Sequence, residues 1–342
     1  MGVFAVDLFC GAGGLSLGLK RTGIDILAGL DNDPSCRFPY ETNIQAPFIE
    51  QDVEALSVDA LAGLFPSTGR KVLVACAPCQ PFSGLTAKNR GEDTRWKLLL
   101  EVQRLTVGLK PDVLSLENVP RLAKLPLWEA FVQSLRNAGY HVSWGVKDAS
   151  RYSVPQRRTR LVLLASLHGE IGLPAPNASA PTTVRQTIAN LPAVEAGQSL
   201  STDILHRSRN LTQANLARIR QSRQSGTWRD WPVDLRAACH TRTTGKTFPS
   251  VYGRMAWDAP SPTITTQFYG FGNGRFGHPE QDRALTLREG ATLQSFPPDF
   301  QFIPTGRKIS FKEIGRLIGN AVPPKLAEAI GTHIVSHLQA VA

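Results

Sequence analysis

The amino-terminal stretch constrains the fold of this 342-residue chain more than any other part of it. Residues 3–9 form an apolar run typical of a buried strand, and a glycine-rich turn follows at residues 10–14. Residues 15–21 then have helical spacing. A strand, a glycine turn and a helix in this order begin Rossmann-like folds, in which ligands lie at the carboxyl ends of the strands. We therefore expect an α/β protein with helices on both faces of a sheet.

Polar residues at the next two strand ends indicate what kind of ligand binds there. The second strand, expected at 24–30, ends at Asp31, where such folds bind ribose hydroxyls. The alternative for Asp31 is a turn acid that starts the next helix. Asp52 follows the third strand and is placed to accept a hydrogen bond from an adenine amino group. The glycine spacing is G-x-G-G and lacks the dinucleotide pattern, so an adenosine-type ligand fits better than the cofactor of an oxidoreductase.

A cysteine between two prolines follows the apolar run at 71–76. Pro78 and Pro81 fix their own φ and bias the preceding residues toward extended conformations, which predicts a stiff loop with Cys79 at its tip. A thiol at a strand end is a candidate nucleophile. Two alternatives stay open: inert packing, and redox or zinc chemistry of the Cys76-x-x-Cys79 pair. Zinc is the weaker one, because the sequence has no second pair of ligands.

Two further strands supply candidate partners for that thiol. The strand at 111–116 is followed by Glu117, which pairs with Cys79 if the two strand ends converge, or else caps the helix that begins near residue 120. Later in the chain, strict alternation places Gln156, Arg158 and Arg160 on one face of an extended segment. Burying three long polar side chains is costly without partners, so a functional role is favoured for them.

The positive charge of the chain is concentrated in one segment. The net charge is +10, and residues 200–254 alone contain ten basic and three acidic side chains. The basic ones are Arg207, Arg209, Arg218, Arg220, Arg223, Arg229, Arg236, Arg242, Lys246 and Arg254. This local excess indicates a polyanion partner, with a merely solvated basic surface as the alternative. Trp228 and Trp231 lie within the segment and favour nucleic acid, because aromatic faces can stack on bases.

Composition limits the remaining possibilities. No apolar run approaches the length of about 18 residues that spans a bilayer, and the N-terminus has no signal-peptide pattern. Five scattered cysteines favour reduced thiols and a cytoplasmic location. Proline, alanine and serine dominate residues 169–181, which predicts a linker, and residues 182–280 have weak periodicity. Helices are expected at 213–223, 285–294 and 325–339, with a turn at 319–324 before the last one.

In order and spacing, these segments resemble the bacterial DNA (cytosine-5) methyltransferases of restriction–modification systems. Residues 7–14 resemble the family's S-adenosylmethionine loop, residues 78–80 its nucleophile motif and residues 117–119 its acid motif. Residues 156–160 match its Q-x-R-x-R element. The motif before the last helix corresponds to 283–297 and the cofactor-closing turn to 319–322. The resemblance covers nearly the whole chain.

The resemblance implies a mechanism. The target cytosine is flipped out of the duplex, because its ring is unreachable inside the stack. Cys79 attacks ring carbon 6 while protonated Glu117 hydrogen-bonds ring nitrogen 3, and carbon 5 takes the methyl group. A base, expected to be water, then removes the carbon 5 proton and the thiol is expelled. Arg160 would hold the cytosine carbonyl, and Arg158 would orient the loop that carries Cys79.

The resemblance also implies the ligand-binding residues and no metal site. The expected S-adenosylmethionine contacts are Phe9, Gly11, Gly13, Gly14, Leu15, Asp31, Asn32, Asp52, Val53, Pro78, Asn320 and Val322. The expected DNA contacts are Gln80, Ser83, Gln156, Arg207, Arg209, Arg242 and Thr263. The family often has Glu where Asp31 stands, so this residue departs from the pattern.

The expected organisation is a Rossmann-like methyltransferase sheet plus a smaller, irregular, mostly β target-recognition domain. The expected division is 1–172 for catalysis and cofactor binding, 173–295 for DNA recognition, and 296–342 as a segment that returns to the catalytic domain. Double-stranded DNA is the expected partner of a monomer located at the nucleoid. A restriction endonuclease of the same system would not be a bound subunit.

Three rival functions remain. Methylation of RNA is disfavoured because the Cys-Phe-Thr signature of that branch is missing from the sequence. An inactive DNA-binding relative is disfavoured by the intact set of Cys79, Glu117 and Arg160. Methylation of an exocyclic amino group would require an Asn/Asp-Pro-Pro-aromatic loop in place of residues 78–80.

Overall fold

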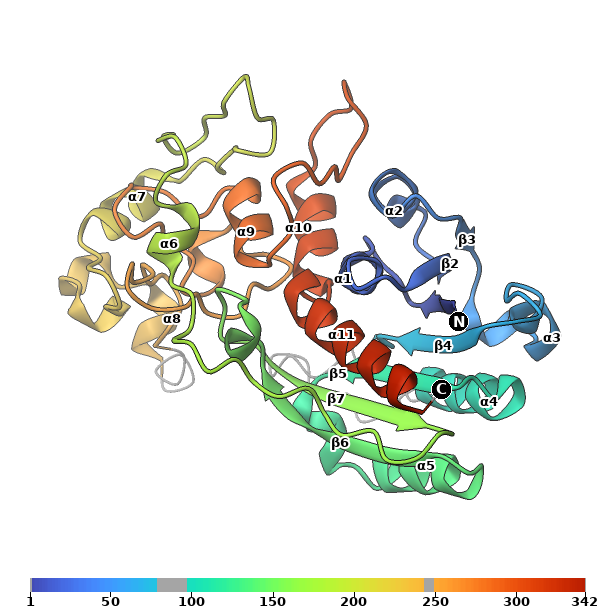
Figure 1. Cartoon of the computed structure of the whole chain (residues 1–342). Coiled ribbons are helices and arrows are strands. Elements are labelled where there is room, and N and C mark those ends of the chain that lie inside the picture. The colour runs from blue at the N-terminus through green and yellow to red at the C-terminus, as the bar shows by residue number, and fades with distance from the viewer. Residues whose placement is uncertain (1, 79–96, 243–248, 342) are drawn as a thin grey trace. The chain divides into compact units, whose positions relative to one another are not determined.

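The computed structural model describes residues 2–78, 97–242 and 249–341, and the chain divides into two compact units (Figure 1). The first unit comprises Met1–Tyr152, Thr159–Ala178 and Ala321–Ala342. The second comprises Ser153–Arg158 and Ser179–Asn320. The assignment of catalysis and recognition to separate stretches of sequence remains a prediction.

The first unit is built on a seven-stranded sheet with the order β3-β2-β1-β4-β5-β7-β6. Its strands are β1 (Val3–Leu8), β2 (Asp25–Asp31), β3 (Phe48–Glu50), β4 (Arg70–Ala75), β5 (Val113–Asn118), β6 (His141–Asp148) and β7 (Thr159–Ser166). The first five strands run parallel, and β7 pairs antiparallel with both β5 and β6. The carboxyl ends of the parallel strands therefore share one edge, as the sequence predicts.

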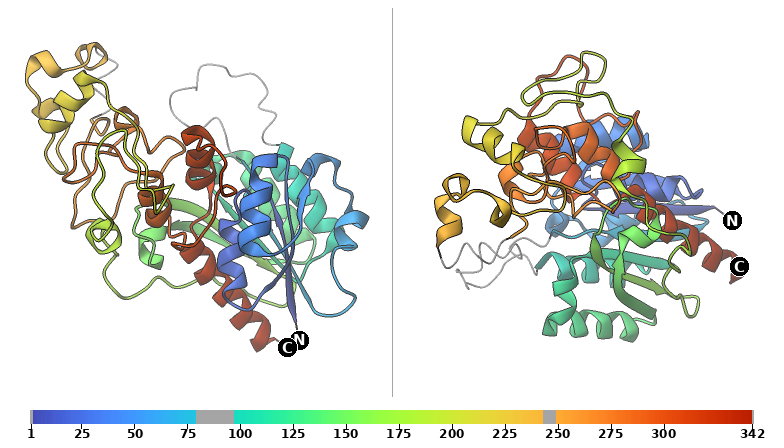
Figure 2. Two further views of the ribbon diagram at one scale, coloured as in Figure 1. Left: turned by 90° about the horizontal axis from the view of Figure 1, so that it is seen from above. Right: turned by 90° about the vertical axis from the view of Figure 1, so that its left-hand side faces the viewer.

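Helices cover both faces of this sheet (Figure 2). The helices of the first unit are α1 (Gly14–Lys20), α2 (Arg37–Ile44), α3 (Val58–Ala62), α4 (Lys97–Leu109), α5 (Pro126–Asn137) and α11 (Pro324–Ala340). The first and last of them lie side by side, although they are far apart in the sequence (Figure 1). Gly18 permits this approach, because a Cβ there would lie 2.4 Å from the Cβ of Ala327. The last helix thus closes the fold onto the N-terminal motif.

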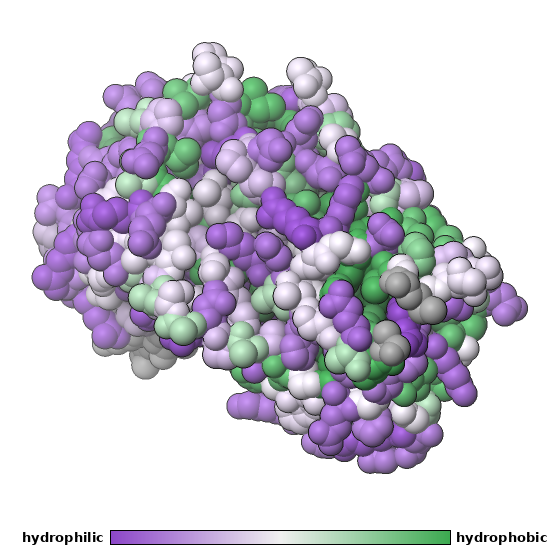
Figure 3. Space-filling model, viewed as in Figure 1, coloured by the Kyte–Doolittle hydropathy of each residue, from purple (hydrophilic) through white to green (hydrophobic). Residues whose placement is uncertain are grey.

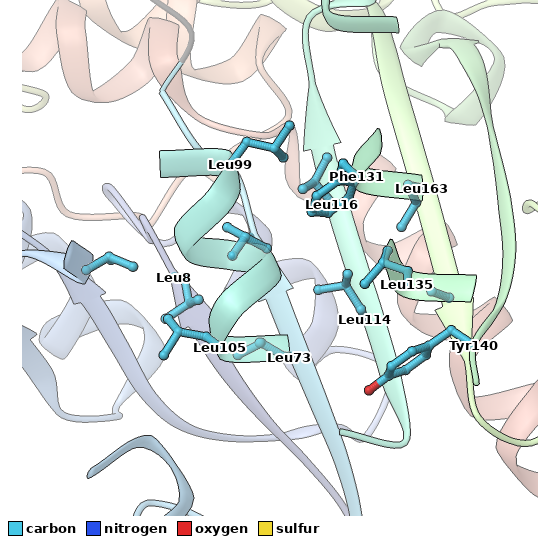
Figure 4. Packing of buried hydrophobic residues seen from close by; sticks show 14 of the residues in the cluster. Leu8, Leu73, Leu99, Leu105, Leu114, Leu116, Phe131, Leu135, Tyr140 and Leu163 are labelled. Carbon is cyan, nitrogen blue, oxygen red and sulfur yellow. The ribbon is translucent and has the colours of Figure 1, made fainter. Parts of the chain in front are cut away.

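Alternate residues of the strands form the main core of the first unit. Leu8, Leu73, Leu114, Leu116 and Leu163 are all fully buried. They pack with apolar side chains of α4 and α5, which come together in the close view of Figure 4. Each such side chain contributes about 1.5–3 kcal/mol relative to exposure. This face of the sheet is therefore apolar, and the opposite face is also largely apolar, since Val72, Val74 and Val113 are fully buried there.

The second unit has little regular structure. Its helices are α6 (Val184–Ile188), α7 (Gln213–Arg220), α8 (Ala238–Thr241), α9 (Leu287–Leu293) and α10 (Phe311–Asn320). Within residues 153–158, 179–242 and 249–320, strand pairing is limited to isolated bridges. The expectation of an irregular unit is confirmed, but the expectation that it is mostly β is wrong for this described part. Its sequence lacks the alternation that would bury one face of a sheet.

Buried arginines take the place of a strand ladder in the second unit. Arg254, 5% exposed, donates hydrogen bonds to the carbonyls of Ile219, Ser222, His278 and Gln281 and also pairs with Asp282. These carbonyls belong to separate loops, so one guanidinium group holds several of them. Buried carbonyls require such donors when no neighbouring strand supplies them.

The expected helices near 213–223, 285–294 and 325–339 are confirmed as α7, α9 and α11. The turn expected at 319–324 is shorter, because α10 continues through Asn320 and α11 begins at Pro324. No helix among the described residues has both the length and the apolar character needed to cross a membrane.

Candidate active site

The carboxyl ends of β4 and β5 define the centre of the site. Ala75 and Leu116 are paired in the parallel register, so the residues that follow them lie next to each other. The amide of Asn118 donates to the carbonyl of Ala77 over 3.1 Å, and its own oxygen accepts from the N–H of Val119 at 2.7 Å. This side chain therefore fixes the base of the segment that leads to Cys79. Cys79 itself, with Gln80 and Ser83, lies outside the described residues.

The structure brings Glu117 and Arg160 together. The Glu117 residue is 4% exposed, and its Oε1 lies 3.0 Å from Nε of Arg160. The antiparallel register of β5 and β7, in which Glu117 faces Val162, carries the arginine to this position. The 3-10 helix that begins at Pro120 has Val119 as its N-cap and no side-chain cap. The helix-cap alternative for Glu117 is therefore wrong.

A second thiol completes the surroundings of this carboxylate. Sγ of Cys76 donates to Oε2 of Glu117 over 3.1 Å. Burial and the charge of Glu117 raise the pKa of the Cys76 thiol well above its ordinary value, so it stays protonated at neutral pH. The sequence analysis considered Cys76 only as half of a redox or zinc pair with Cys79, and it gave Asn118 no role of its own. Their positions in the two strand-end motifs were the only signal.

The glycine loop after β1 meets the acid after β2. The N–H of Gly11 donates to Oδ2 of Asp31 at 2.9 Å, and Oδ1 of the same carboxylate accepts from the N–H of Asp33 at 3.0 Å. Gly11 and Gly13 have φ values of 52° and 89°, in the left-handed region that favours glycine. The residue that caps the following 3-10 helix is Asp33 and not Asp31. The alternative role considered for Asp31, an acid that starts this helix, is therefore performed by Asp33.

A buried carboxyl group lies beneath this loop. Asp7 has no exposed surface, and its Oδ2 accepts from Oγ of Ser16 at 2.6 Å, which in turn lies 2.8 Å from the hydroxyl of Tyr40. Burial, with a further contribution from the charge of Asp31, raises the pKa of Asp7 to about 7. The sequence analysis gave Asp7 no role of its own, although a carboxylate inside an apolar strand was the available signal.

The other expected cofactor residues differ in exposure. Asn32, Asp52 and Pro78 are exposed, and the Asp52 side chain caps a short helix by accepting from the N–H of Glu54 at 3.0 Å. Phe9 adopts a φ of 60°, in the left-handed region. Of the next five, four lie in the first unit: Gly14, Leu15 and Val322 are buried, and Val53 packs in the main core. Asn320 is an exposed residue of the second unit.

The expectation that Gln156, Arg158 and Arg160 share one strand face is wrong. The strand β7 begins only at Thr159, and residues 153–158 belong to the second unit. The Gln156 amide is fully buried, where it donates to Oε1 of Gln294 at 2.6 Å and accepts from the N–H of Ile264 at 2.9 Å. Its expected DNA contact is corrected accordingly: these internal hydrogen bonds already engage the side chain.

Two more expected site residues have internal partners in the second unit. Arg158, 3% exposed, donates to the carbonyls of Ile264 and Gly319 over 3.1 and 3.2 Å. The hydroxyl of Thr263 donates to the carbonyl of Arg157 at 2.8 Å. These contacts connect the short 153–158 segment to the rest of the unit. An orienting role for Arg158 toward Cys79 remains a prediction.

The basic segment separates into exposed and buried members. Exposed arginines include Arg209, Arg220, Arg223, Arg229 and Arg242, and Arg207 is half-buried. On the face shown in Figure 3, hydrophilic side chains predominate over α7 and the segments beside it. Arg254 is buried, and Lys246 lies outside the described residues. The prediction that Trp228 and Trp231 offer faces to bases is wrong, because both are buried in a local apolar cluster.

Comparison with known proteins identifies the family. The family model described as C-5 cytosine-specific DNA methylase matches residues 4–336. The chain belongs to this family. The enzyme is 46% identical to the Type II methylase M.HgiDII of Herpetosiphon aurantiacus over 98% of this chain and 95% of that protein. It is 32% identical to the Type II methyltransferase M1.HphI of Haemophilus parahaemolyticus over 98% of this chain and 87% of that protein.

Solved structures support the fold of the enzyme. A prophage-encoded DNA modification methyltransferase of E. coli aligns with a TM-score of 0.76 at 21% identity, covering 99% of this chain and all of the other. A DNMT2 of Spodoptera frugiperda aligns with a TM-score of 0.68 at 16% identity, over 99% of this chain and all of that one. The prediction of a DNA (cytosine-5) methyltransferase with a Rossmann-like sheet is thus confirmed, and the enzyme acts on DNA.

Proposed function

We propose that the enzyme methylates carbon 5 of a cytosine flipped out of duplex DNA, through a transient covalent bond between Cys79 and ring carbon 6. The observation that carries the proposal is the arrangement around Glu117. Its carboxylate lies beside Arg160, at the end of the strand next to the one that leads to Cys79. A nucleophile, an acid and a cation at one sheet edge suit addition to an electron-poor ring.

The reaction proceeds by addition and elimination. The Cys79 thiolate donates its electron pair to carbon 6, and the ring electrons move toward nitrogen 3, where protonated Glu117 donates a hydrogen bond. Carbon 5 then becomes nucleophilic and accepts the methyl group. A base removes the carbon 5 proton, the electrons return to the ring, and the bond from sulfur to carbon 6 breaks. Arg160 holds the cytosine carbonyl.

S-adenosylmethionine is the proposed cofactor, and when bound it supplies an electrophilic methyl group. The residues present fit such a molecule. A Cβ built on Gly11 meets nothing within 4 Å, so the loop leaves open space there. The Asp31 carboxylate accepts backbone hydrogen bonds from Gly11 and Asp33, so an acceptor of the kind that ribose hydroxyls require lies against the glycine loop. Asp52 and Val53 would contact the adenine, and Asn320 and Val322 the methionine end.

The second unit is the proposed DNA-recognition region. Its exposed arginines, including Arg209 and Arg242, provide positive charge that contacts with phosphate groups require. The resemblance of the chain to Type II methylases supports a protective role beside a restriction endonuclease that is not a bound subunit. The enzyme would act as a monomer on chromosomal DNA in the cytoplasm.

A single substitution tests the nucleophile. Cys79→Ser should abolish transfer of a tritiated methyl group to duplex DNA, because the hydroxyl is a far weaker nucleophile at neutral pH, while sequence-specific DNA binding survives. The matched control is Cys239→Ala, which removes an exposed thiol of the second unit and should leave turnover unchanged. Turnover retained in Cys79→Ser would refute the assignment. Bisulfite sequencing of DNA from cells that express the enzyme would identify the methylated site.

A further inference from the structure

Cys76 is the member of the Cys76-x-x-Cys79 pair that the proposed mechanism does not use. Its thiol lies at the end of β4, and its sulfur is 3.1 Å from Oε2 of Glu117. The raised pKa of this thiol means that Cys76 is a neutral S–H donor and not a thiolate. The hydrogen bond to the catalytic acid remains to be explained.

We propose that Cys76 is a positioning residue for Glu117: its S–H group donates to one carboxylate oxygen and so fixes the orientation of the carboxylate. The inference rests on the proposed role of Glu117 as the group that hydrogen-bonds ring nitrogen 3. It adds a residue that acts through Glu117 and does not itself touch the substrate.

The geometry around the carboxylate supports this role. Glu117 lies on β5, between β4 and β7. Arg160, from β7, forms an ion pair with Oε1 at 3.0 Å that lacks hydrogen-bond geometry, whereas Cys76, after β4, donates a hydrogen bond to Oε2 at 3.1 Å. The orientation of the carboxylate therefore depends on the hydrogen bond from the thiol, with the charge of Arg160 beside the other oxygen. A catalytic acid needs a defined orientation, because small displacements of a reacting group lower the rate strongly.

The chemistry of a thiol suits this task better than that of a stronger donor. An S–H group is a weak donor, so it stabilises the carboxylate without competing strongly with the cytosine ring. The other ionisable groups that act on the thiol are Arg160, whose charge opposes the rise in its pKa, and Asp7, which adds to it.

Two substitutions separate orientation from packing. Cys76→Ala removes the donor and should lower kcat about tenfold, which corresponds to roughly 1.4 kcal/mol, the size of one hydrogen bond. KM for DNA and for S-adenosylmethionine should change less than about twofold. Cys76→Ser restores an O–H donor and should return kcat to within about threefold of the unaltered enzyme.

The controls decide between the outcomes. Thermal unfolding of both Cys76 variants should match that of the unaltered enzyme, and Cys239→Ala should not change kcat. In a Glu117→Gln background, measured under single-turnover conditions, Cys76→Ala should add little further loss. An unchanged kcat in Cys76→Ala, a kcat that Cys76→Ser does not restore, or a full additional loss in the Glu117→Gln background would overturn the inference.

The same experiments distinguish failure of this inference from failure of the proposed function. If Glu117→Gln is nearly inactive and Cys76→Ala behaves as the unaltered enzyme, only the positioning role of Cys76 fails. If Glu117→Gln retains full methyl transfer, the catalytic role of Glu117 fails, and the inference about Cys76 fails with it.

Discussion

The two units of this enzyme are stabilised by different interactions. In the first unit, alternating apolar residues of parallel strands, such as Leu8 and Leu114, form the core. In the second, the guanidinium groups of Arg254 and Arg283 are buried and hydrogen-bond to backbone carbonyls of separate loops. The two units therefore hold their residues in place by different means. A sheet fixes catalytic groups through backbone register, whereas loops held by a few arginines can differ in sequence between recognition units.

The Arg283 contacts show how much depends on one such side chain. Arg283 has no exposed surface, and it donates two hydrogen bonds of 2.8 Å to the carboxylate of Glu289 and another to the carbonyl of Val194. Burial acts to raise the pKa of Glu289, but the hydrogen bonds and charge of Arg283 lower it to about 2. Glu289 is therefore a buried anion that is stable only with its partner.

The largest expected effect is on this pair. Arg283→Met should lower the free energy of unfolding of the second unit by about 3–5 kcal/mol, because it leaves a buried carboxylate without its counter-charge. Urea unfolding of the full chain measures the loss. Adding Glu289→Leu should recover part of it, since an apolar pair needs no counter-charge. If Arg283→Met lowers the free energy of unfolding no more than substitution of an exposed arginine does, buried arginines do not have the proposed stabilising role.

The matched change in the first unit is Leu114→Ala. It should cost about 2–5 kcal/mol, through lost apolar burial and the cavity that remains. This loss should depend little on pH or salt, because no charge is involved. If the loss in free energy of unfolding caused by Leu114→Ala depends strongly on salt, the proposed difference between the two units is contradicted.

Acid should shift the stabilities of the two units in opposite directions. Burial lowers the pKa of His278, in the second unit, from 6.5 to about 4, so the neutral ring is favoured in the fold and stability is lost as pH falls from 6.5 to 4. The loss is on the order of 3 kcal/mol. Burial raises the pKa of Asp7, in the first unit, to about 7, so its ionised carboxylate destabilises the fold. This destabilisation decreases as pH falls from 7 to about 4, because the carboxyl group becomes protonated in the folded state.

Urea unfolding at several pH values tests this contrast. His278→Asn should remove most of the acid sensitivity between pH 6.5 and 4, and Asp7→Asn should remove the opposing gain. Identical pH dependence in both variants and the unaltered enzyme would show that neither group titrates as the structure indicates.

The sequence predicts the first unit better than the second, because only the first has strands with regular apolar periodicity. Strand periodicity and strand-end residues predicted the sheet and the strand-end positions of Asp31 and Glu117, but not the hydrogen bond between Asp31 and the glycine loop or the ion pair of Arg160 with Glu117. The second unit has no such period, so Arg254 was counted as a DNA-facing charge although it is buried. Trp228 was likewise assigned to bases, because charge and aromatic content do not reveal which side chains a loop buries.

The smallest effect on stability, and the largest on DNA binding, is expected for exposed arginines. Arg209→Ala and Arg242→Ala should each change the free energy of unfolding by less than about 0.5 kcal/mol. If each contacts a phosphate, each should weaken DNA binding and reduce the slope of log K against log salt by about 0.9. Arg136→Ala, an exposed arginine of the first unit, is the control and should leave the slope unchanged. Equal slopes in all variants would mean that these arginines do not face DNA.

Covalent trapping tests the central claim most directly. Duplex DNA with 5-fluorocytosine at the target position cannot lose a proton from carbon 5, so elimination fails after methyl transfer and the thiol stays bonded to carbon 6. With S-adenosylmethionine supplied, the enzyme should form a denaturant-resistant complex with this DNA, attached through Cys79 in a peptide map, and Cys79→Ser should form none. Absence of the complex with the unaltered enzyme, or attachment through another residue, would contradict the account.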